Sequence, residues 1–237
     1  MELFGNIFNF ILHLDKNLTL IIQSYGNLTY LLLFTIIFME TGFVVTPFLP
    51  GDSLLFVAGT LAANSSLNIF PLYILFLFAA ILGDNTNYWI GHFIGPKVFK
   101  KENARLFKKE YLVKTAQYFA KYGVKTIIIA RFIPIVRTFT PFVAGIGRMH
   151  YPQFIKYDIF GGWLWVSIFC LGGYWFGNLA IIKNNFHTAI FLIIFLSILP
   201  GIIEYLKHKR KKQAIGTTES INYKTLEETF RKQHLSD

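Results

Sequence analysis

The stretch ETGFVVTPFLPGDSLLFVAGTLAA, residues 40–63, decides how this chain folds. Almost every residue in it is apolar or small, yet it also holds two acids and two prolines: Glu40, Asp52, Pro47 and Pro50. Proline lacks a backbone N–H and its ring clashes with the preceding helical turn, so Pro47 and the Pro50-Gly51 pair predict breaks in any helix here. We therefore expect a helix that stops, turns and restarts in apolar surroundings.

The composition indicates that those surroundings are a membrane. The 237 residues are 54% hydrophobic and only 15% charged, which is more apolar surface than one soluble core requires. Four apolar runs are long enough to cross a hydrocarbon core of about 30 Å, namely residues 28–45, 67–90, 159–176 and 188–206. A weaker candidate covers residues 124–145. We expect an all-α integral membrane protein with several transmembrane helices.

Three parts are predicted along the chain. Residues 1–27 carry Asp15 and Lys16 within an apolar run, which favours a leading amphipathic or membrane-associated helix over a span. Residues 28–206 form the membrane domain. Residues 207–237 form a basic tail, and the Thr-x-x-Glu pattern that begins at Thr225 predicts a short helix in it.

The lysines and arginines predict the topology. Lys16 is the only lysine or arginine before Lys97, whereas residues 97–125 hold eight lysines and Arg105, and the run KHKRKK follows the last apolar segment. By the positive-inside rule the 97–125 loop and the C-terminus are both cytoplasmic. We do not expect nucleic acid as a partner, because juxtamembrane lysines ordinarily mark topology and attract anionic lipid head groups.

This topology predicts that residues 124–147 enter and leave the membrane on one side. Because 159–176 and 188–206 form an out-and-back pair, the segment before them must start and finish in the cytoplasm. Its sequence holds Pro134 and Pro141, where a continuous helix would break. We expect a re-entrant hairpin, which is tolerated at membrane depth only where it is buried in protein or lines a wet cavity.

The two proline-bearing segments resemble each other. PFLPGDSLLFVAG, residues 47–59, and RFIPIVRTFTPFVAG, residues 131–145, share an aromatic-aliphatic-proline start and an identical FVAG end that closes at Gly59 and Gly145. The topology brings them in from opposite faces. We therefore expect an inverted-topology repeat with two facing hairpins, an arrangement that places a transport site near the membrane midplane.

Four charged residues are the candidate site: Glu40, Asp52, Arg131 and Arg137. Each would cost roughly 2.5–3.5 kcal/mol at the centre of a membrane helix, so each should meet a partner or water. One interpretation is that they form internal ion pairs that hold the repeats together. The other is that the arginines bind an anionic head group while a carboxylate exchanges a proton.

Three motifs make the chain resemble the DedA family of bacterial inner-membrane proteins. They are Glu40 followed by FLPGD at residues 48–52, GDNTNYWIGHFIG at 83–95, and RFIPIVRTFTPFVAG at 131–145. The resemblance covers roughly residues 28–180. It departs at Asn87, where family members usually have glycine, and at His92, where arginine is common.

The resemblance implies that the protein returns polyprenyl phosphate, the lipid carrier of cell-wall assembly, across the bacterial inner membrane. It also implies that the two acids and two arginines are functional. Members of the family that the chain resembles are associated with maintenance of the proton-motive force. Asp84 and Tyr88 are candidates for supporting roles; for Asp84, capping or linking helices is an equally good interpretation. An alternative function is a proton-coupled antiporter or small-solute transporter that uses the same charges.

Other site classes are not indicated. The six histidines show no metal-ligand spacing, and there is no phosphate-binding glycine loop, HExxH helix or nucleophile elbow, so we expect neither metal, cofactor nor covalent catalysis. Cys170 is the only cysteine, which precludes a disulfide within the chain. The small-xxx-small spacing of Gly91 and Gly95 is compatible with an oligomer.

Overall fold

The computed structural model describes residues 14–43, 51–64, 66–94, 109–176 and 179, and all regular secondary structure in these ranges is helical. The helices are α2 Leu14–Tyr25, α3 Leu28–Gly42, α4 Gly51–Ala63, α5 Ile69–Ile94, α7 Lys109–Tyr122, α8 Thr126–Ala130, α9 Pro134–Ile146, α10 Tyr151–Val166 and α11 Gly172–Phe176. A 3₁₀ turn at Gly123–Lys125 precedes α8, and a π-helical turn at Ser167–Leu171 joins α10 to α11. The all-α prediction is confirmed for the described residues.

Two long helical segments form the centre of the fold. Helix α5 and the continuous segment Tyr151–Phe176 have 26 residues each, and both are long and apolar enough to cross a membrane. At 1.5 Å per residue each extends about 39 Å, which exceeds a hydrocarbon core of about 30 Å. Large apolar side chains are exposed along both, as Phe78 and Trp163 illustrate at 58% and 47% exposure.

The proline-bearing regions contain only short helices. Helix α3 has 15 residues, and α4 and α9 have 13 each, so they extend about 20–22 Å. The predicted crossing at 28–45 is therefore too long, because α3 ends at Gly42 and Phe43 already has extended backbone. The tip residues Pro47 and Pro50 and the predicted span 188–206 lie outside the described residues.

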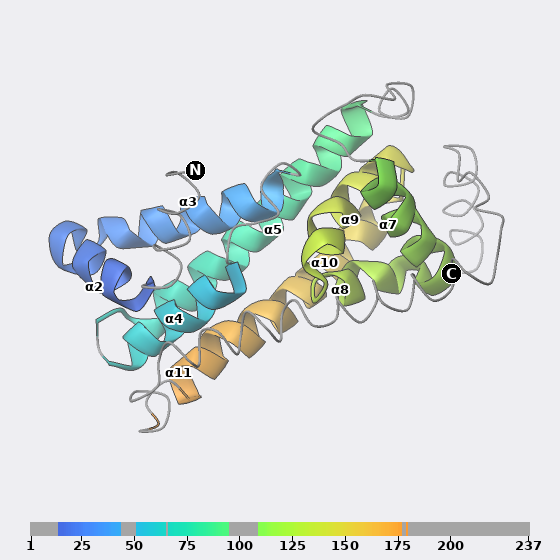
Figure 1. The fold of residues 1–237 in the computed structure, drawn as a ribbon. Coiled ribbons are helices and arrows are strands. Elements are labelled where there is room, and N and C mark those ends of the chain that lie inside the picture. The colour runs from blue at the N-terminus through green and yellow to red at the C-terminus, as the bar shows by residue number, and fades with distance from the viewer. Residues whose placement is uncertain (1–13, 44–50, 65, 95–108, 177–178, 180–237) are drawn as a thin grey trace.

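The short helices lie at opposite ends of the long ones. Figure 1 shows α2, α3 and α4 towards one end of α5, and α7, α8 and α9 towards the other. Helices α3 and α9 both pack on α5, whereas α4 packs on α11. Helix α8 also packs on α10, so each long segment supports short helices from both halves of the chain.

Two apolar cores follow from this arrangement. One joins α3, α4, the first half of α5 and the α10–α11 junction, and the other joins the end of α5 with α7, α9 and the start of α10. On α5 the first core reaches Ala80 and the second begins at Tyr88, with Asp84 between them. On α10 the acid Asp158 likewise lies between Phe154 and Trp165. Buried acids on both long segments thus lie between the two cores.

The first FVAG segment packs backbone to backbone against the second long segment. A Cβ added at Gly59 would lie 3.0 Å from the carbonyl carbon of Cys170. In return, a Cβ added at Gly173 would lie 2.8 Å from the carbonyl carbon of Phe56. At both positions the carbonyl oxygen would lie closer still, which excludes a real side chain, so α4 and α11 approach this closely because glycine is present on each.

The second FVAG segment makes the same contact with the first long segment. A Cβ at Gly145 would lie 3.0 Å from the carbonyl carbon of Tyr88, and a Cβ at Gly91 would lie 2.9 Å from that of Phe142. Each short helix contributes a phenylalanine and the glycine three residues after it, and each long segment contributes a pair with the same spacing. Phe56 and Gly59 contact Gly173 and Cys170, and Phe142 and Gly145 contact Gly91 and Tyr88. The sequence repeat is therefore also a repeat of contacts, exchanged between the halves of the chain.

The two prolines of the second segment act differently. Pro134 is the first residue of α9, after a short turn at residues 131–133, so the predicted break is correct there. Pro141 lies inside α9, which continues to Ile146, so the break predicted at Pro141 is wrong. Its missing N–H removes one helix hydrogen bond, to the carbonyl of Arg137, and the buried packing of α9 on α5 retains the helix around it.

Candidate functional site

Arg137 is the centre of a buried ion cluster that joins three helices. From α9, its Nη2 donates to Oε1 of Glu40 on α3, and its Nη1 donates to Oδ1 of Asp52 on α4 over 2.7 Å. The side chain of Glu40 is fully buried, that of Arg137 is 7% exposed and that of Asp52 is 15% exposed. We call these three residues and Trp165 the Arg137 cluster.

Trp165 of α10 completes this cluster. Its Nε1 donates to the same Oδ1 of Asp52 over 2.8 Å, and its ring lies 4.8 Å from the guanidinium carbon of Arg137. A cation over an indole face is attracted by the ring quadrupole, and more strongly where water is excluded. Trp165 is fully buried, so one side chain both stabilises the cation and donates to its counter-ion.

Gly51 makes room for the Glu40 carboxylate. A Cβ at Gly51 would lie 2.6 Å from the carboxyl carbon of Glu40 and 2.7 Å from its Oε1. The first turn of α4 can therefore lie against the carboxylate only because residue 51 has no side chain. The sequence predicted Gly51 as a turn residue, and the structure gives it this additional role.

Arg131 is the centre of a second buried cluster. It lies in the turn between α8 and α9, and its Nη2 donates to Oδ2 of Asp84 on α5 and, over 2.5 Å, to Oδ1 of Asp158 on α10. The three side chains are 3%, 3% and 1% exposed. We call them the Arg131 cluster. It ties the start of α9 to both long segments.

A pair of glycines on α10 accommodates the Arg131 side chain. A Cβ at Gly161 would lie 3.1 Å from Cδ of Arg131, and a Cβ at Gly162 would lie 3.4 Å from its Nη1. The first contact is tighter than most real Cβ contacts, so the glycines let the side chain pass beside the helix.

The four predicted charges are thus all paired, with Asp52 partly exposed and the other three buried, but they lie in two separate clusters. Arg137 forms ion pairs with both predicted acids, Glu40 and Asp52. Arg131 pairs instead with Asp84 and Asp158. Asp84 is a direct ion-pair partner of Arg131, and its supporting role in the site stays a prediction.

The remaining predicted residues support packing. Tyr88 lies in the second core, where its hydroxyl donates to the Met149 carbonyl over 2.5 Å and its ring stacks on Phe154. Gly145 packs against the Tyr88 carbonyl. Neither belongs to an ion cluster among the residues described.

Asn87, where family members usually have glycine, links three helices. Its Nδ2 donates to the Thr41 carbonyl on α3 over 3.1 Å and to the Thr138 carbonyl on α9 over 2.8 Å. The departure therefore adds two buried hydrogen bonds at the junction of the two halves.

Sequence reasoning missed Asp158 and Trp165. Asp158 directly precedes the predicted apolar run 159–176, so the sequence does not mark it as a charge inside a membrane segment. The helix begins at Tyr151, which places Asp158 two turns inside it. Trp165 is one of four tryptophans and no sequence pattern distinguishes it, since its role depends on packing across helices.

Both clusters leave polar atoms without hydrogen-bond partners. Among the described residues these atoms include Glu40 Oε2, Arg137 Nε, Asp84 Oδ1, Asp158 Oδ2 and two nitrogens of Arg131. Each cluster has one cation and two carboxyl groups, so it carries a formal charge of −1 when all are ionised. The described part of the chain contains no group of three His, Cys, Asp or Glu side chains that could hold a metal ion.

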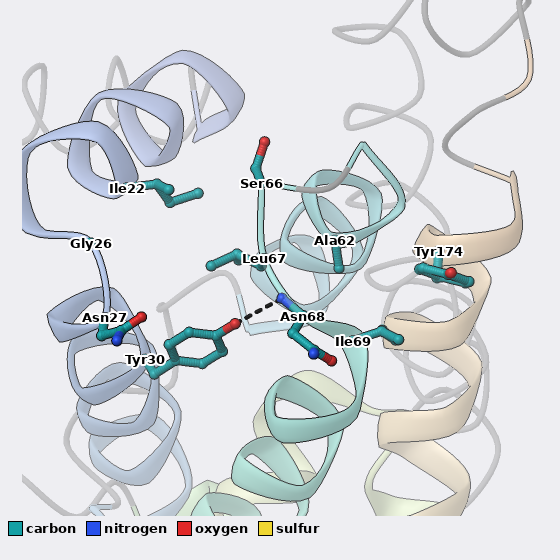
Figure 2. Close-up of a pocket in the computed structure, with 10 residues that line it drawn as sticks. All are labelled: Ile22, Gly26, Asn27, Tyr30, Ala62, Ser66, Leu67, Asn68, Ile69 and Tyr174. Atoms are coloured by element: carbon teal, nitrogen blue, oxygen red, sulfur yellow. Dashed lines mark hydrogen bonds between the residues drawn. The ribbon is translucent and has the colours of Figure 1, made fainter.

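A separate cavity of about 460 Å³ lies near the turn between α2 and α3. Figure 2 shows that Tyr30, Asn68 and Tyr174 are among the residues that line it, and the Tyr30 hydroxyl accepts a hydrogen bond from the Asn68 N–H over 2.7 Å. None of the described residues that line it is charged. On α4 it reaches Ala62, ten residues and about 15 Å of helix from Asp52, so it offers an anion no counter-charge.

Comparison with known proteins identifies the family. The VTT domain family matches residues 49–175, which include Asp52, both arginines, Asp84, Asp158 and Trp165. Protein DedA of Escherichia coli (strain K12) is 50% identical over 212 residues, or 89% of this chain and 97% of that protein. The chain belongs to the DedA family.

More distant relatives extend the comparison. Uncharacterized membrane protein Rv0364 of Mycobacterium tuberculosis (strain ATCC 25618 / H37Rv) is 43% identical over 180 residues, or 75% of this chain and 79% of that protein. Inner membrane protein YqjA of E. coli (strain K12) is 32% identical over 160 residues, or 68% and 73%. No solved structure matches this chain. With its apolar long helices, the chain is a membrane protein of the DedA family.

Proposed function

We propose that this DedA-family protein returns polyprenyl phosphate across the bacterial inner membrane, with the Arg137 cluster as the site of the phosphate head. The observation that carries the proposal is that a buried arginine binds two carboxylates through two different nitrogens, where four helices meet. Arginine presents a planar, permanently charged fork that suits the oxygens of phosphate. A lipid phosphate would exchange with one of the carboxylates.

The arrangement of the halves supports a transport site near mid-membrane. The exchanged FVAG contacts suggest two equivalent halves, and the half-length helices α3, α4 and α9 suggest two re-entrant hairpins that face each other in an inverted-topology repeat. In such transporters the site lies at the repeat interface near the bilayer midplane. The Arg137 cluster takes Glu40 and Asp52 from one hairpin and Arg137 from the other.

Proton coupling is part of the proposal. With one cation and two carboxyl groups, the Arg137 cluster carries a formal charge of −1, which is costly in a membrane interior. A proton on Glu40 or Asp52 would neutralise it, and release of that proton when the substrate moves would couple transport to the proton gradient. The same exchange would serve a proton-coupled antiporter for small solutes, so the substrate distinguishes the two functions.

Purified protein in liposomes provides the test. A reporter-labelled polyprenyl phosphate is added to one leaflet, and its appearance in the other is followed with and without a pH gradient. We expect movement that depends on the protein and increases with the gradient, and no comparable movement of a polyprenol without the phosphate. If only protons and small ions move, the proposal is wrong and the antiporter function is favoured.

A further inference from the structure

We propose that the Asp52 carboxylate occupies the anion seat of this protein, and that Trp165 is a ligand of the incoming anion. This inference rests on the proposed function and assigns a further substrate-binding residue to it. The seat is the position of Asp52 Oδ1, which accepts from Arg137 Nη1 over 2.7 Å and from Trp165 Nε1 over 2.8 Å.

The two donors are well suited to a phosphate oxygen. Both are held in place by burial, since Trp165 is fully buried and the Arg137 side chain is 7% exposed. The indole ring lies 4.8 Å from the guanidinium carbon, so it supports the cation while its N–H points to the counter-ion. Hydrogen bonds from such donors to a charged oxygen are stronger than those between neutral groups.

Asp52 is the carboxylate that can leave. Its side chain is 15% exposed, whereas that of Glu40 is fully buried, and it lies in the first turn of α4. The Glu40 carboxylate packs directly against the backbone of Gly51, where an added Cβ would lie 2.6 Å from its carboxyl carbon. Displacement of Asp52 would therefore open the seat while the Arg137–Glu40 pair stays together.

The charges of the exchange balance when the Asp52 carboxylate takes up a proton as it leaves, which is the proton of the proposed coupling. When Asp52 leaves, Arg137 and Glu40 form a neutral pair. A singly charged phosphate head in the seat restores the formal charge of −1 that Asp52 had given the cluster. Asp52 is thus an internal competitor, which keeps the arginine paired while no substrate is bound.

The test measures binding of farnesyl phosphate to the purified full-length protein in detergent by titration calorimetry, with farnesol and inorganic phosphate as comparison probes. Trp165→Phe keeps a ring over Arg137 but removes the N–H. We expect this variant to bind farnesyl phosphate roughly tenfold or more weakly, the effect of losing one hydrogen bond to a charged group. Trp163→Phe is the matched control, because Trp163 is on the same helix and 47% exposed, and it should bind like the wild type.

Asp52→Ala is the second variant to be measured. It tests the inference even if Trp165→Phe does not fold. Removal of the internal competitor predicts tighter binding of farnesyl phosphate together with slower transport, because the seat is no longer closed after release. Equal binding by Trp165→Phe and the wild type, or weaker binding by Asp52→Ala, would overturn the inference. If the wild-type protein binds no farnesyl phosphate, the proposed function itself fails. Equal affinity for inorganic phosphate would assign the seat to free phosphate instead of a lipid head.

Discussion

Arg137 binds Glu40 and Asp52 through two separate nitrogens, and this geometry indicates how its two interpretations can be tested. A residue that only balances charge could be any cation. A residue that shares its nitrogens among oxygens from two helices, and could transfer one of them to a substrate, has to be a guanidinium. The clearest test at the residue scale is therefore a substitution that keeps the positive charge and changes the shape of the side chain.

Arg137→Lys retains the positive charge but offers one nitrogen instead of two. We expect transport of polyprenyl phosphate to decrease roughly tenfold or more, because hydrogen bonds to charged groups contribute about 1.5–3 kcal/mol each. Liposome transport should be measured beside abundance in the membrane. Arg148→Lys is the control, since Arg148 is exposed. Near-normal transport by Arg137→Lys would show that only its charge matters.

Gly51→Ala tests the space beneath the Glu40 carboxylate. The added Cβ would lie 2.6 Å from the carboxyl carbon, so either Glu40 or the first turn of α4 must move. Overpacking of this kind typically costs about 1–3 kcal/mol. We expect a lower melting temperature and impaired transport. Gly172→Ala is the control, because nothing lies within 4 Å of the Cβ position at Gly172, and wild-type stability for both variants would contradict the placement of Glu40.

At this scale the sequence predicted the charged residues but not their pairing. Glu40, Asp52, Arg131 and Arg137 are recognisable because charges inside apolar runs are costly and need partners. Which acid meets which arginine depends on how far each helix extends, and that is how Asp158 was missed. A buried tryptophan such as Trp165 gives no signal of this kind, because an apolar helix contains aromatic residues for many reasons.

At the scale of elements, the FVAG segment occurs twice in the sequence, and both copies make the same kind of backbone contact with a long helical segment. The sequence could not predict that each copy packs on the long segment of the other half, since contacts between halves are not encoded in local patterns. The helix breaks were predicted only in part. Pro134 begins α9, whereas Pro141 lies inside it, because buried packing on a neighbouring helix outweighs one lost hydrogen bond.

The exchanged contact predicts equivalent effects in the two halves. In Gly59→Ala and in Gly145→Ala the new Cβ meets a backbone carbonyl carbon at 3.0 Å, which cannot rotate away as a side chain could. We expect each substitution to lower thermal stability by about 1–3 kcal/mol, with Gly172→Ala unaffected. Thermal unfolding of the three variants in one detergent provides the comparison. A large effect in one half and none in the other would argue against equivalent packing.

At the scale of the whole molecule, the lysine distribution predicts the topology. A tag after Asp237 and a cysteine at Glu110 should both be accessible only from the cytoplasm, because basic loops remain on that side. The measurement is labelling of each with a membrane-impermeant reagent in intact and in permeabilised cells. Labelling of either position in intact cells would contradict the hairpin arrangement that we propose for residues 124–147.

The central claim is that the acids of the Arg137 cluster act in transport and do not merely hold the helices together. The most direct measurement is the pH-dependent rate of polyprenyl phosphate movement in liposomes for Glu40→Gln and Asp52→Asn, each beside its melting temperature. We expect both neutral variants to insert and fold, because removal of a buried charge lowers the desolvation cost as it removes a partner, and we expect transport to fail. A structural ion pair predicts the opposite, a loss of about 3–5 kcal/mol of stability from the unpaired Arg137. Stable variants that transport at the wild-type rate with unchanged pH dependence would contradict the claim.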